Sequence, residues 1–379
     1  MKGKTTILSQ IKFLVFTLLV ACNSSNVNPA GPDWSSVKTS IAPQAQVSGY
    51  GTPYPLDINT LGWEDGQNIT PDGLTVYCFY SAMDLFAFSF SDDAADPCAV
   101  GAYLRGPFQS IMSSVPPSLA NSCEKFANSD IVISNRSSVN DPFPEWSLSN
   151  VSFPGTLEGA PQVILNASNP DIVDYFAFTY LNPEPSNNSN TDDIAIYKNT
   201  NRNPTGTFEL LPTPINGSQT TEDNPHLERI TDSNLVLFFT SSDRPDTKGD
   251  VDIFYSETQD AGSTWSAVES VNFNSPLFED MPHIWKDSLD VYWMYYMNSD
   301  SNIAKRKQST PGDWKNWDNA ETVIDKGNAV AVGEPTLTQW GDIAFGLIYD
   351  AGTGFGTDQT NRYDDDIWIL PKKGSPFDK

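Results

Sequence analysis

The chain is predicted to be all-β, a five-bladed β-propeller whose last blade is closed by a strand from the N-terminus. The first observation is a motif that recurs along the sequence. "EGAP", "EDNP", "EDMP" and "VGEP" end at prolines spaced 64, 57 and 53 residues apart. A weaker copy, "WEDGQNITPDG", begins at Trp63 and has Gln67 in the place of the proline. Repetition at such a period is the sequence pattern of propellers, in which each repeat forms one blade.

The second observation is that every copy of the motif precedes the same series of predicted strands. An opening strand is followed by a run rich in β-branched and aromatic residues, and then by a run that starts with Asp-Ile or Asn-Ile. The aromatic runs lie at 74–80, 174–180, 234–240, 289–297 and 342–350. The Asp-Ile or Asn-Ile runs lie at 130–134, 193–197, 252–256, 302–306 and 366–370. An outer strand follows in the first four copies, so four strands are expected in each blade.

The third observation is that the strand missing from the fifth copy occurs at the other end of the chain. "LDINTLGWED" (56–65) matches "VNFNSPLFED" (271–280) without a gap, so residues 56–59 are expected to form the outer strand of the last blade. Such closure leaves no open sheet edge. The predicted propeller spans residues 50–375, with an insertion at about 91–128 in the first blade.

The N-terminus has the pattern of a secretory signal, because lysines precede an apolar run at 13–21 that is too short to span a bilayer. "LVAC" resembles the bacterial lipobox, which implies a lipoprotein signal at residues 1–22 and lipidation of Cys22. We expect residues 23–49 to be a flexible tether. The chain would then be attached to the bacterial cell envelope by its lipid, at the outer membrane. Ordinary cleavage, or a short uncleaved anchor, is the alternative.

The net charge and the cysteines indicate which partners, disulfides and metals are expected. The net charge of −26 would repel a phosphate backbone, so nucleic acid is not an expected partner. Cys98 and Cys123 flank the predicted insertion, and a disulfide between them is expected in an oxidising compartment. Cys78 lies in the apolar run "TVYCFY" and is expected to be buried and free. No Cys/His cluster indicates zinc.

Two parts of the sequence resemble known propeller repeats. "TPDG" at 70–73 and "SSDRP" at 241–245, with the recurring Asp-x-x-Pro, resemble the WD40-like PD40 repeats of TolB-type bacterial propellers. "TQDAGSTW" (258–265) resembles the Asp-box of sialidase-type propellers. In those folds the Asp-box stabilises a turn remote from the active site, so this resemblance implies a fold rather than an activity. The few arginines here do not favour the arginine triad of a sialidase.

The motif Glu-Asp-x-Pro-His occurs twice and contains the only two histidines, His226 and His283. Because it recurs with the blade period, we interpret it first as a structural device. The Asp carboxylate is expected to cap backbone N–H groups, and the Pro to fix the start of the innermost strand. The histidines would then line the channel or pack between blades. Zinc is not expected, since no third protein ligand is evident.

The start of each innermost strand should lie at the mouth of the central channel. A ring of five carboxylates is expected there, one from each blade: Asp65, Glu158, Asp223, Asp280 and Glu334. Converging carboxylates raise one another's pKa or hold a cation. No cofactor is firmly indicated, but Ca²⁺ at Asp223 and Asp280 is the one to consider. Trp63 and Trp285 are the aromatic residues expected near the mouth, together with His226 and His283.

Non-catalytic binding of a glycan or protein ligand at this mouth is the favoured function. The alternative is a glycoside hydrolase, because the architecture resembles the five-bladed propellers of arabinanase- and levanase-type enzymes. That resemblance implies catalytic carboxylates from different blades around a central pocket. Asp65 would be base or nucleophile, Asp223 the residue that modulates pKa, and Glu334 the acid. The sequence departs from that family because these acids arise from the repeat itself.

Overall fold

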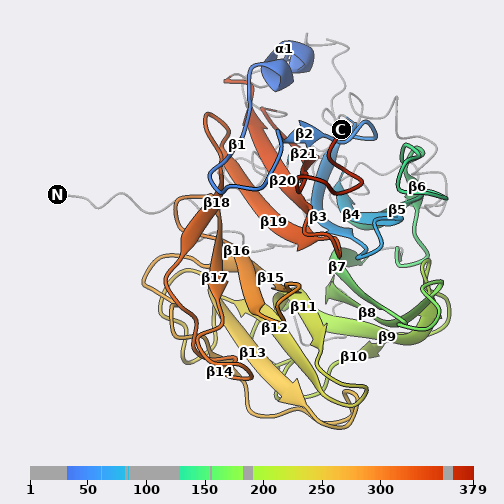
Figure 1. Cartoon of the computed structure of the whole chain (residues 1–379). Helices are drawn as coiled ribbons and strands as arrows, with labels where there is room; N and C mark the ends of the chain where they lie inside the picture. The colour runs from blue at the N-terminus through green and yellow to red at the C-terminus, as the bar shows by residue number, and fades with distance from the viewer. Residues whose placement is uncertain are drawn as a thin grey trace, which may run out of the picture.

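The computed structural model describes residues 32–60, 62–81, 84, 129–153, 156–181, 191–352 and 362–379. Five small antiparallel sheets are arranged in a ring, and the first strand of each sheet faces a common central channel (Figure 1). This arrangement confirms the predicted all-β, five-bladed propeller. Cys22, Cys98, Cys123 and the insertion at 91–128 lie outside the described residues, so the lipidation and disulfide predictions stay predictions.

From the channel outward, the first blade consists of β3 (Trp63–Ile69), β4 (Thr75–Ser81), β5 (Asp130–Asn135) and β6 (Ser147–Leu148). The second consists of β7 (Leu157–Leu165), β8 (Ile172–Leu181), β9 (Asp193–Asn201) and β10 (Glu209–Leu210). The third consists of β11 (Asp223–Arg229), β12 (Leu235–Ser241), β13 (Asp252–Thr258) and β14 (Glu269–Ser270).

The fourth blade consists of β15 (Asp280–Lys286), β16 (Tyr292–Met297), β17 (Ile303–Lys307), β18 (Glu321–Asp325) and, outermost, β1 (Gln44–Ala45). The fifth consists of β19 (Ala331–Leu337), β20 (Ile343–Asp350), β21 (Tyr363–Leu370) and β2 (Tyr54–Pro55). The two short strands β1 and β2 therefore join sheets made almost wholly from residues late in the sequence.

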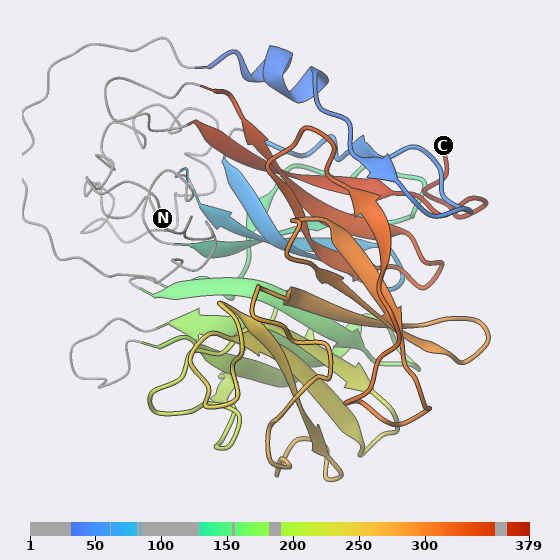
Figure 2. The same cartoon turned by 90° about the vertical axis from the view of Figure 1, so that its left-hand side faces the viewer.

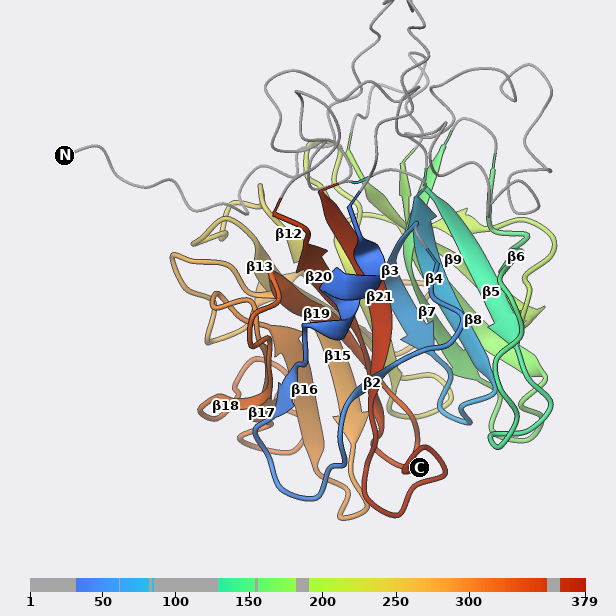
Figure 3. The ribbon, with the colours of Figure 1, turned by 90° about the horizontal axis from the view of Figure 1, so that it is seen from above.

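Strand β2 closes the ring as predicted, although at a slightly different place. Tyr54 pairs with Ile369 and Pro55 with Trp368 (Figure 3). Residues 56–59, predicted as this strand, lie along the same edge of the sheet without extending the strand. There the Asn59 side-chain amide donates to the Ile367 carbonyl at 2.8 Å. A side-chain amide thus takes over the pairing after the backbone ladder ends.

Residues 23–49 were predicted to be a flexible tether, but the part of this segment that the structure describes is folded. Asp33 caps the short helix α1 (Trp34–Thr39), whose Trp34 is only 5% exposed. The chain then adds β1 to the fourth blade, where Gln44 pairs with Asp325 (Figure 2). We call residues 33–49 the N-terminal arm. It is folded because its apolar and cationic side chains have partners on blades four and five.

The core consists of apolar layers between adjacent blades. In β12 every residue is buried, and successive side chains point to opposite neighbours. Val236 and Phe238 pack toward the fourth blade, while Leu237 and Phe239 pack toward the second. Burial of both faces explains why the aromatic runs do not alternate with polar residues. Cys78 lies within such a layer, buried and free as predicted. In the described part of the chain, no helix is long and apolar enough to cross a membrane.

Candidate functional site

All five inner strands carry the same irregularity near their start. The pairing with the second strand of the blade shifts register across the motif, as it does between Asp223 and His226. At each shift one residue adopts a left-handed backbone, with φ between 43° and 58°: Gly66, Ala160, Asn224, Met281 and Glu334. Such a conformation is uncommon for residues other than glycine, and it is typical of a β-bulge. The opening motif therefore encodes a bulge at the channel.

The bulge fixes which motif residues are equivalent, and they are not the five acids expected as a ring. The residue before each left-handed position is Asp65, Gly159, Asp223, Asp280 or Gly333. Glu158 lies one position earlier than these residues and Glu334 one position later. A shift of one residue turns a strand side chain to the other face. Only three blades therefore place an aspartate at the shared position.

Glu158 belongs to a separate set of buried glutamates, each of which caps the segment that enters its inner strand. Glu158 accepts hydrogen bonds from the Phe153 N–H at 3.1 Å and from the Thr156 hydroxyl. The equivalent bonds are Thr60 N–H to Glu64, Gly217 N–H to Glu222 and Ser275 N–H to Glu279. The fifth blade has Val332 at this position. Glu158 is therefore a structural cap.

The aspartates cap the bulge and remain half-exposed at the mouth. Asp65, Asp223 and Asp280 each accept a hydrogen bond from the next backbone N–H, at 3.0, 2.7 and 2.7 Å. These bonds confirm the predicted capping role. Asp223 also accepts from the Thr179 hydroxyl at 2.7 Å, and Asp280 from the Asn224 amide at 3.0 Å. Each carboxylate is thus held in one orientation from its own and a neighbouring blade.

Three carboxyls meet at the junction of the first and fifth blades. Asp65 lies within side-chain hydrogen-bonding reach of both Glu334 and Asp365. Burial, followed by the neighbouring charge of Asp65, raises the pKa of Glu334 well above its usual range. The same causes raise the pKa of Asp365. Asp365, in the run "YDDDIWIL" that begins at Tyr363, was missed at the sequence level because it comes from a third strand, outside the repeated motif.

Asp280 is affected in a similar way on the other side of the mouth. Burial, followed by the charge of Asp223, raises the pKa of Asp280 to about 6. Among the described residues, no group of three or more His, Cys, Asp or Glu is arranged to hold a metal ion. The Asn224 amide donates to Asp280, so a hydrogen-bond donor already occupies one oxygen of the expected calcium pair.

Below the mouth the channel is narrow. Four prolines and Gln67 line it, with the bulge residues above and the following residues beneath, around a space of about 40 Å³. That volume admits only a few water molecules, since about 10 to 15 Å³ of such space holds one water. A sugar ring does not fit. A ligand of the propeller would therefore rest on the mouth and not enter the channel.

The two histidines connect blades. Their rings contact each other with centroids 4.3 Å apart, and His283 accepts the Leu337 N–H of the next blade at 3.2 Å. Gln162 and Thr336, at equivalent positions, accept the Leu227 and Ile69 N–H groups in the same way. Burial lowers the pKa of His226 to about 3, and it also lowers the pKa of His283. Both are therefore neutral packing residues between blades.

The structure does not place the two expected aromatic residues on a ligand surface at the mouth. Trp63 is 2% exposed, and its indole N–H donates to Asp65 at 2.9 Å, so it orients that carboxylate. Trp285 lies near the far end of β15, where its indole N–H donates to the Thr338 carbonyl at 3.1 Å. The spacing from the motif could have shown this, because Trp285 follows Asp280 by five residues along a strand that leaves the mouth.

The "TQDAGSTW" segment (258–265) forms a closed turn after β13. The Asp260 carboxylate accepts from the Ser263 and Thr264 N–H groups at 3.0 and 2.8 Å, and from the Thr258 hydroxyl at 2.7 Å. Hydrogen bonds, first that from the Thr264 hydroxyl, lower the pKa of Asp260. Strand β13 runs away from the mouth, so this turn lies at the opposite end of its blade.

No protein-family model matches the chain, and no curated protein sequence matches it. Solved structures resemble it in fold. A protein of unknown function from Dyadobacter fermentans is 10% identical, with 86% of this chain and 100% of that chain covered and a TM-score of 0.47. An alpha-L-arabinanase from Penicillium chrysogenum is 11% identical, with 88% and 99% covered and a TM-score of 0.43. A thermostable family-43 glycoside hydrolase is 12% identical, with 85% and 96% covered and a TM-score of 0.44.

Proposed function

We propose that the mouth of this propeller binds a glycan without cleaving it. The supporting observation is the set of half-exposed carboxylates that several blades present at one opening, each fixed by its own backbone. Fixed acceptors suit ligand hydroxyl groups, because little side-chain freedom is lost on binding. A protein ligand that offers hydroxyl or amide donors is the other class that such a surface would accept.

Two features weigh against catalysis at this place. Glycosidase carboxyls are separated by about 5 to 9.5 Å, so that the sugar or a water fits between them. Here Asp65 lies within hydrogen-bonding reach of both Glu334 and Asp365, which leaves no room for a sugar or a water between these carboxyls. The channel beneath has room for water only. This geometry favours recognition from above.

Glycoside hydrolysis is the second candidate, and one observation favours it. Glu334 is half-buried, and burial followed by the charge of Asp65 raises its pKa, so it holds a proton more readily than the other acids at the mouth. A protonated and an ionised carboxyl in one site are what acid–base catalysis needs. In that case Glu334 would be the acid, Asp65 the base or nucleophile and Asp223 the residue that modulates pKa. Glu158 would have no part in it, since it is a buried cap.

We further propose that lipidation of Cys22 anchors the protein to the outer membrane of the bacterial envelope, with a glycan as its partner. The N-terminal arm would then begin about ten residues after the lipid. Metabolic labelling with a fatty acid, compared between the wild type and Cys22→Ser, tests this anchor. Binding of Ca²⁺ at Asp223 and Asp280 is a separate proposal, which titration of the protein with Ca²⁺ tests directly.

One experiment separates the two candidate functions. The protein is run through gels that contain soluble arabinan, galactan, xylan, β-glucan or polygalacturonate, and the same polymers are assayed for released reducing ends. Retardation without release, lost in Asp223→Asn/Asp280→Asn, supports binding. Release that disappears in Glu334→Gln would establish the hydrolase instead. If the protein is neither retarded nor active on any polymer, the glycan proposal fails.

A further inference from the structure

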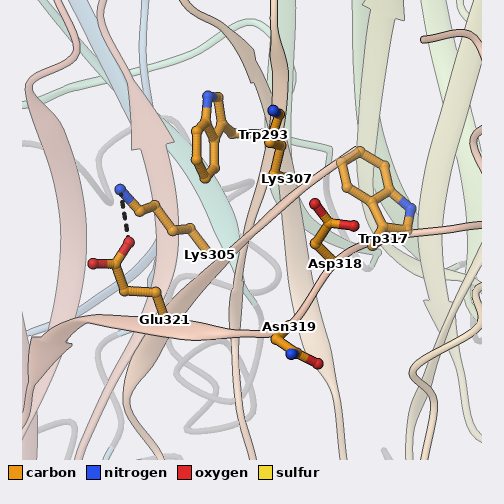
Figure 4. A pocket seen from close by; sticks show the side chains of 7 residues that line it. All are labelled: Trp293, Lys305, Lys307, Trp317, Asp318, Asn319 and Glu321. Carbon is orange, nitrogen blue, oxygen red and sulfur yellow. Dashed lines mark ion pairs between the residues drawn. The ribbon is translucent and has the colours of Figure 1, made fainter. Parts of the chain in front are cut away.

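We propose that the outer part of the fourth blade carries a second binding site, separate from the mouth, which takes a neutral oligosaccharide. The site is a surface groove of about 610 Å³ (Figure 4). Its lining residues are Trp293, Lys305, Lys307, Trp317, Asp318, Asn319 and Glu321. Small-molecule sites commonly have volumes of about 300 to 1,000 Å³, so the groove has room for one or two sugar rings.

The groove arises from the way the chain returns to β17. Lys305 pairs with Glu321 in the β17–β18 ladder, and Gln308 pairs with Trp317 in an isolated bridge. Between these two points the returning chain is one residue longer than β17. The Asp318 N–H still donates to the Lys307 carbonyl at 2.8 Å, so the extra length lies at residues 319 and 320, and all three residues are exposed. The resulting hollow is built into the blade and is bounded by backbone that is paired at both ends.

A fixed aromatic ring lies at one side of this hollow. The Trp293 indole N–H donates to Asp287 at 3.0 Å, and the Lys305 ammonium lies 4.8 Å from the ring centroid. Lys305 is itself held by Glu321 at 3.2 Å. Trp293 remains half-buried, so part of the indole faces the groove together with the lysine methylenes. An aromatic surface fixed before binding contacts the C–H face of a sugar at little cost in entropy.

The charges around the groove indicate an uncharged ligand. Two lysines and two carboxylates line it, so the formal charges cancel, and Asn319 adds a neutral amide. Hydroxyl groups both donate and accept, and they can therefore pair with ammonium, amide and carboxylate alike. The whole chain carries a net charge of −26, which repels anionic polymers at longer range. A neutral polyhydroxyl chain satisfies all of these groups.

The groove is distant from the mouth along the strands, and it does not depend on the function proposed there. Asp280 pairs with Met297 at the mouth end of the fourth blade, whereas Lys286 pairs with Tyr292 at the far end. Trp293 and its partner Lys307 lie at this far end. A polymer could contact either site alone, and the two sites can be tested by separate variants.

The test is affinity electrophoresis of the wild-type protein in gels with neutral arabinan, galactan, xylan or β-glucan, and with polygalacturonate as the anionic probe. We expect retardation by at least one neutral polymer and a dissociation constant raised at least about ten-fold in Trp293→Ala. Lys307→Ala, at an exposed residue that does not affect folding, should raise it several-fold. The matched control is Lys286→Ala, because Lys286 lies over Tyr292 at 5.4 Å on the same blade, outside the groove.

The outcomes separate this proposal from the one for the mouth. Retardation that persists in Asp223→Asn/Asp280→Asn and is weakened in Lys307→Ala and Trp293→Ala supports the groove. Loss in the mouth variant alone, with the groove variants unchanged, would overturn the groove and leave the mouth as the binding site. Retardation by polygalacturonate only, or equal weakening in Lys286→Ala, would also overturn it, as would no retardation at all.

Discussion

At the scale of single residues, each successive position of the opening motif has a different structural role. The glutamate caps the incoming segment, the aspartate caps the bulge and faces the mouth, and the next residue adopts the left-handed backbone. The proline lines the channel, and in the second, fourth and fifth blades the residue after it accepts a backbone N–H of the next blade. Because these positions alternate between core, channel and mouth, residues one apart have unrelated environments.

The capping glutamate of the second blade gives the first prediction. Glu158 is fully buried, and burial raises its pKa to about 8. The Thr156 hydroxyl has one proton and two acceptors within reach, Glu158 and the Phe153 carbonyl at 3.1 Å. When Glu158 is neutral, its O–H can donate to the Thr156 oxygen and leave the Thr156 proton to the carbonyl. In Glu158→Gln the amide N–H replaces this donor. We expect unchanged stability at pH 6 and a gain of about 2 to 3 kcal/mol at pH 9, because Glu158 of the unfolded wild type is already ionised at pH 6 while the folded protein must ionise it or pull the loop open above about pH 8.

Urea unfolding at both pH values measures this effect, with Glu269→Gln as an exposed control. Equal stability of Glu158→Gln and the wild type at pH 9 would contradict the prediction, since it would mean that Glu158 is ionised in the folded protein. A loss at pH 6 would show that both oxygens must accept hydrogen bonds.

The inter-blade contact of His283 gives the second prediction. In His283→Leu the buried Leu337 N–H loses its acceptor, which should lower the free energy of unfolding by about 1 to 3 kcal/mol. His283→Gln should retain most of the stability, because Gln162 makes the same contact in the second blade. Chemical denaturation of both variants is the measurement. If both are equally destabilised, ring packing against His226 and not the hydrogen bond explains the role of His283.

Residue identity was only partly predictable from the sequence. The capping aspartates and the packing histidines followed from recurrence, because the same contact occurs in several blades. The bond from Trp63 to Asp65 within β3 did not follow, because Trp63 was expected to face a ligand. Asp365 did not follow, because its contact with Asp65 joins the first and last blades. Sequence order does not bring these residues together. Only closure of the ring does.

At the scale of elements, the N-terminal arm supplies a charge that the last blade lacks. Lys38 forms ion pairs with Asp364 at 2.7 Å and Asp366 at 2.6 Å, and it donates to the Thr60 carbonyl at 3.2 Å. Both aspartates are buried, at 4% and 3% exposure. Without the ammonium, two carboxyls on one strand would face each other, and Glu64, also buried, lies close enough to feel their charge.

We therefore predict that Lys38→Met is strongly destabilising. Removing one partner of a buried ion pair costs about 3 to 5 kcal/mol, and we expect the lower part of that range because Lys38 is one-fifth exposed. The loss should be larger at pH 8 than at pH 5, since protonation of the two aspartates relieves their repulsion. Thermal unfolding at both pH values is the measurement.

Lys315→Met is the matched control, because Lys315 forms an exposed pair with Glu269 that solvent screens, so its loss should change stability little. Asp364→Asn combined with Lys38→Met should recover part of the loss by removing one carboxylate. If Lys38→Met is no worse than Lys315→Met, the arm is held by Trp34 and β1 alone.

The strands of the blades could be predicted from the sequence, whereas the helix and strand of the N-terminal arm could not. The aromatic runs are long enough to identify a strand without context, and their order repeats. The arm contains a helix of six residues and a strand of two, both too short for a periodic pattern. Its polar composition is that of a linker. Its structure depends on acids more than 300 residues later in the sequence, which no local pattern reveals.

At the scale of the whole molecule, the chain is strongly acidic, and its folding into a closed ring buries many of its carboxyl groups. Burial, as the largest cause in each case, raises the pKa of Glu158 to about 8, of Glu222 to about 7 and of Asp280 to about 6. His226 is affected in the opposite direction, with its pKa lowered to about 3 by burial. The stability of the propeller must therefore depend on pH in two opposed ways.

The sign of each contribution follows from proton linkage. A carboxyl whose pKa is higher in the folded protein binds more protons there, so its stabilisation is complete below the unfolded pKa and is lost as pH rises through the folded value. A histidine whose pKa is lower in the folded protein contributes above about pH 6.5 and loses that contribution as pH falls. Above pH 6.5 the histidines no longer titrate, and only the carboxyls act.

We accordingly predict that stability falls between pH 6.5 and pH 8.5. With about 2.1 cal/mol/K of unfolding entropy per residue, each 1 kcal/mol lowers the Tm of a propeller of roughly 330 residues by about 1.5 °C. Since linkage to Glu158 alone corresponds to about 2 kcal/mol over this range, a fall of at least about 3 °C is expected. Calorimetry at fixed ionic strength across this range is the measurement. Glu158→Gln should reduce the slope, because it removes one of the titrating groups, while Glu269→Gln should leave it unchanged. A Tm that is constant or rises with pH would mean that the buried carboxyls are ionised in the folded ring. Glu334 and Asp365 would then be expected to be ionised as well, and the mouth would bind cations more readily than glycans.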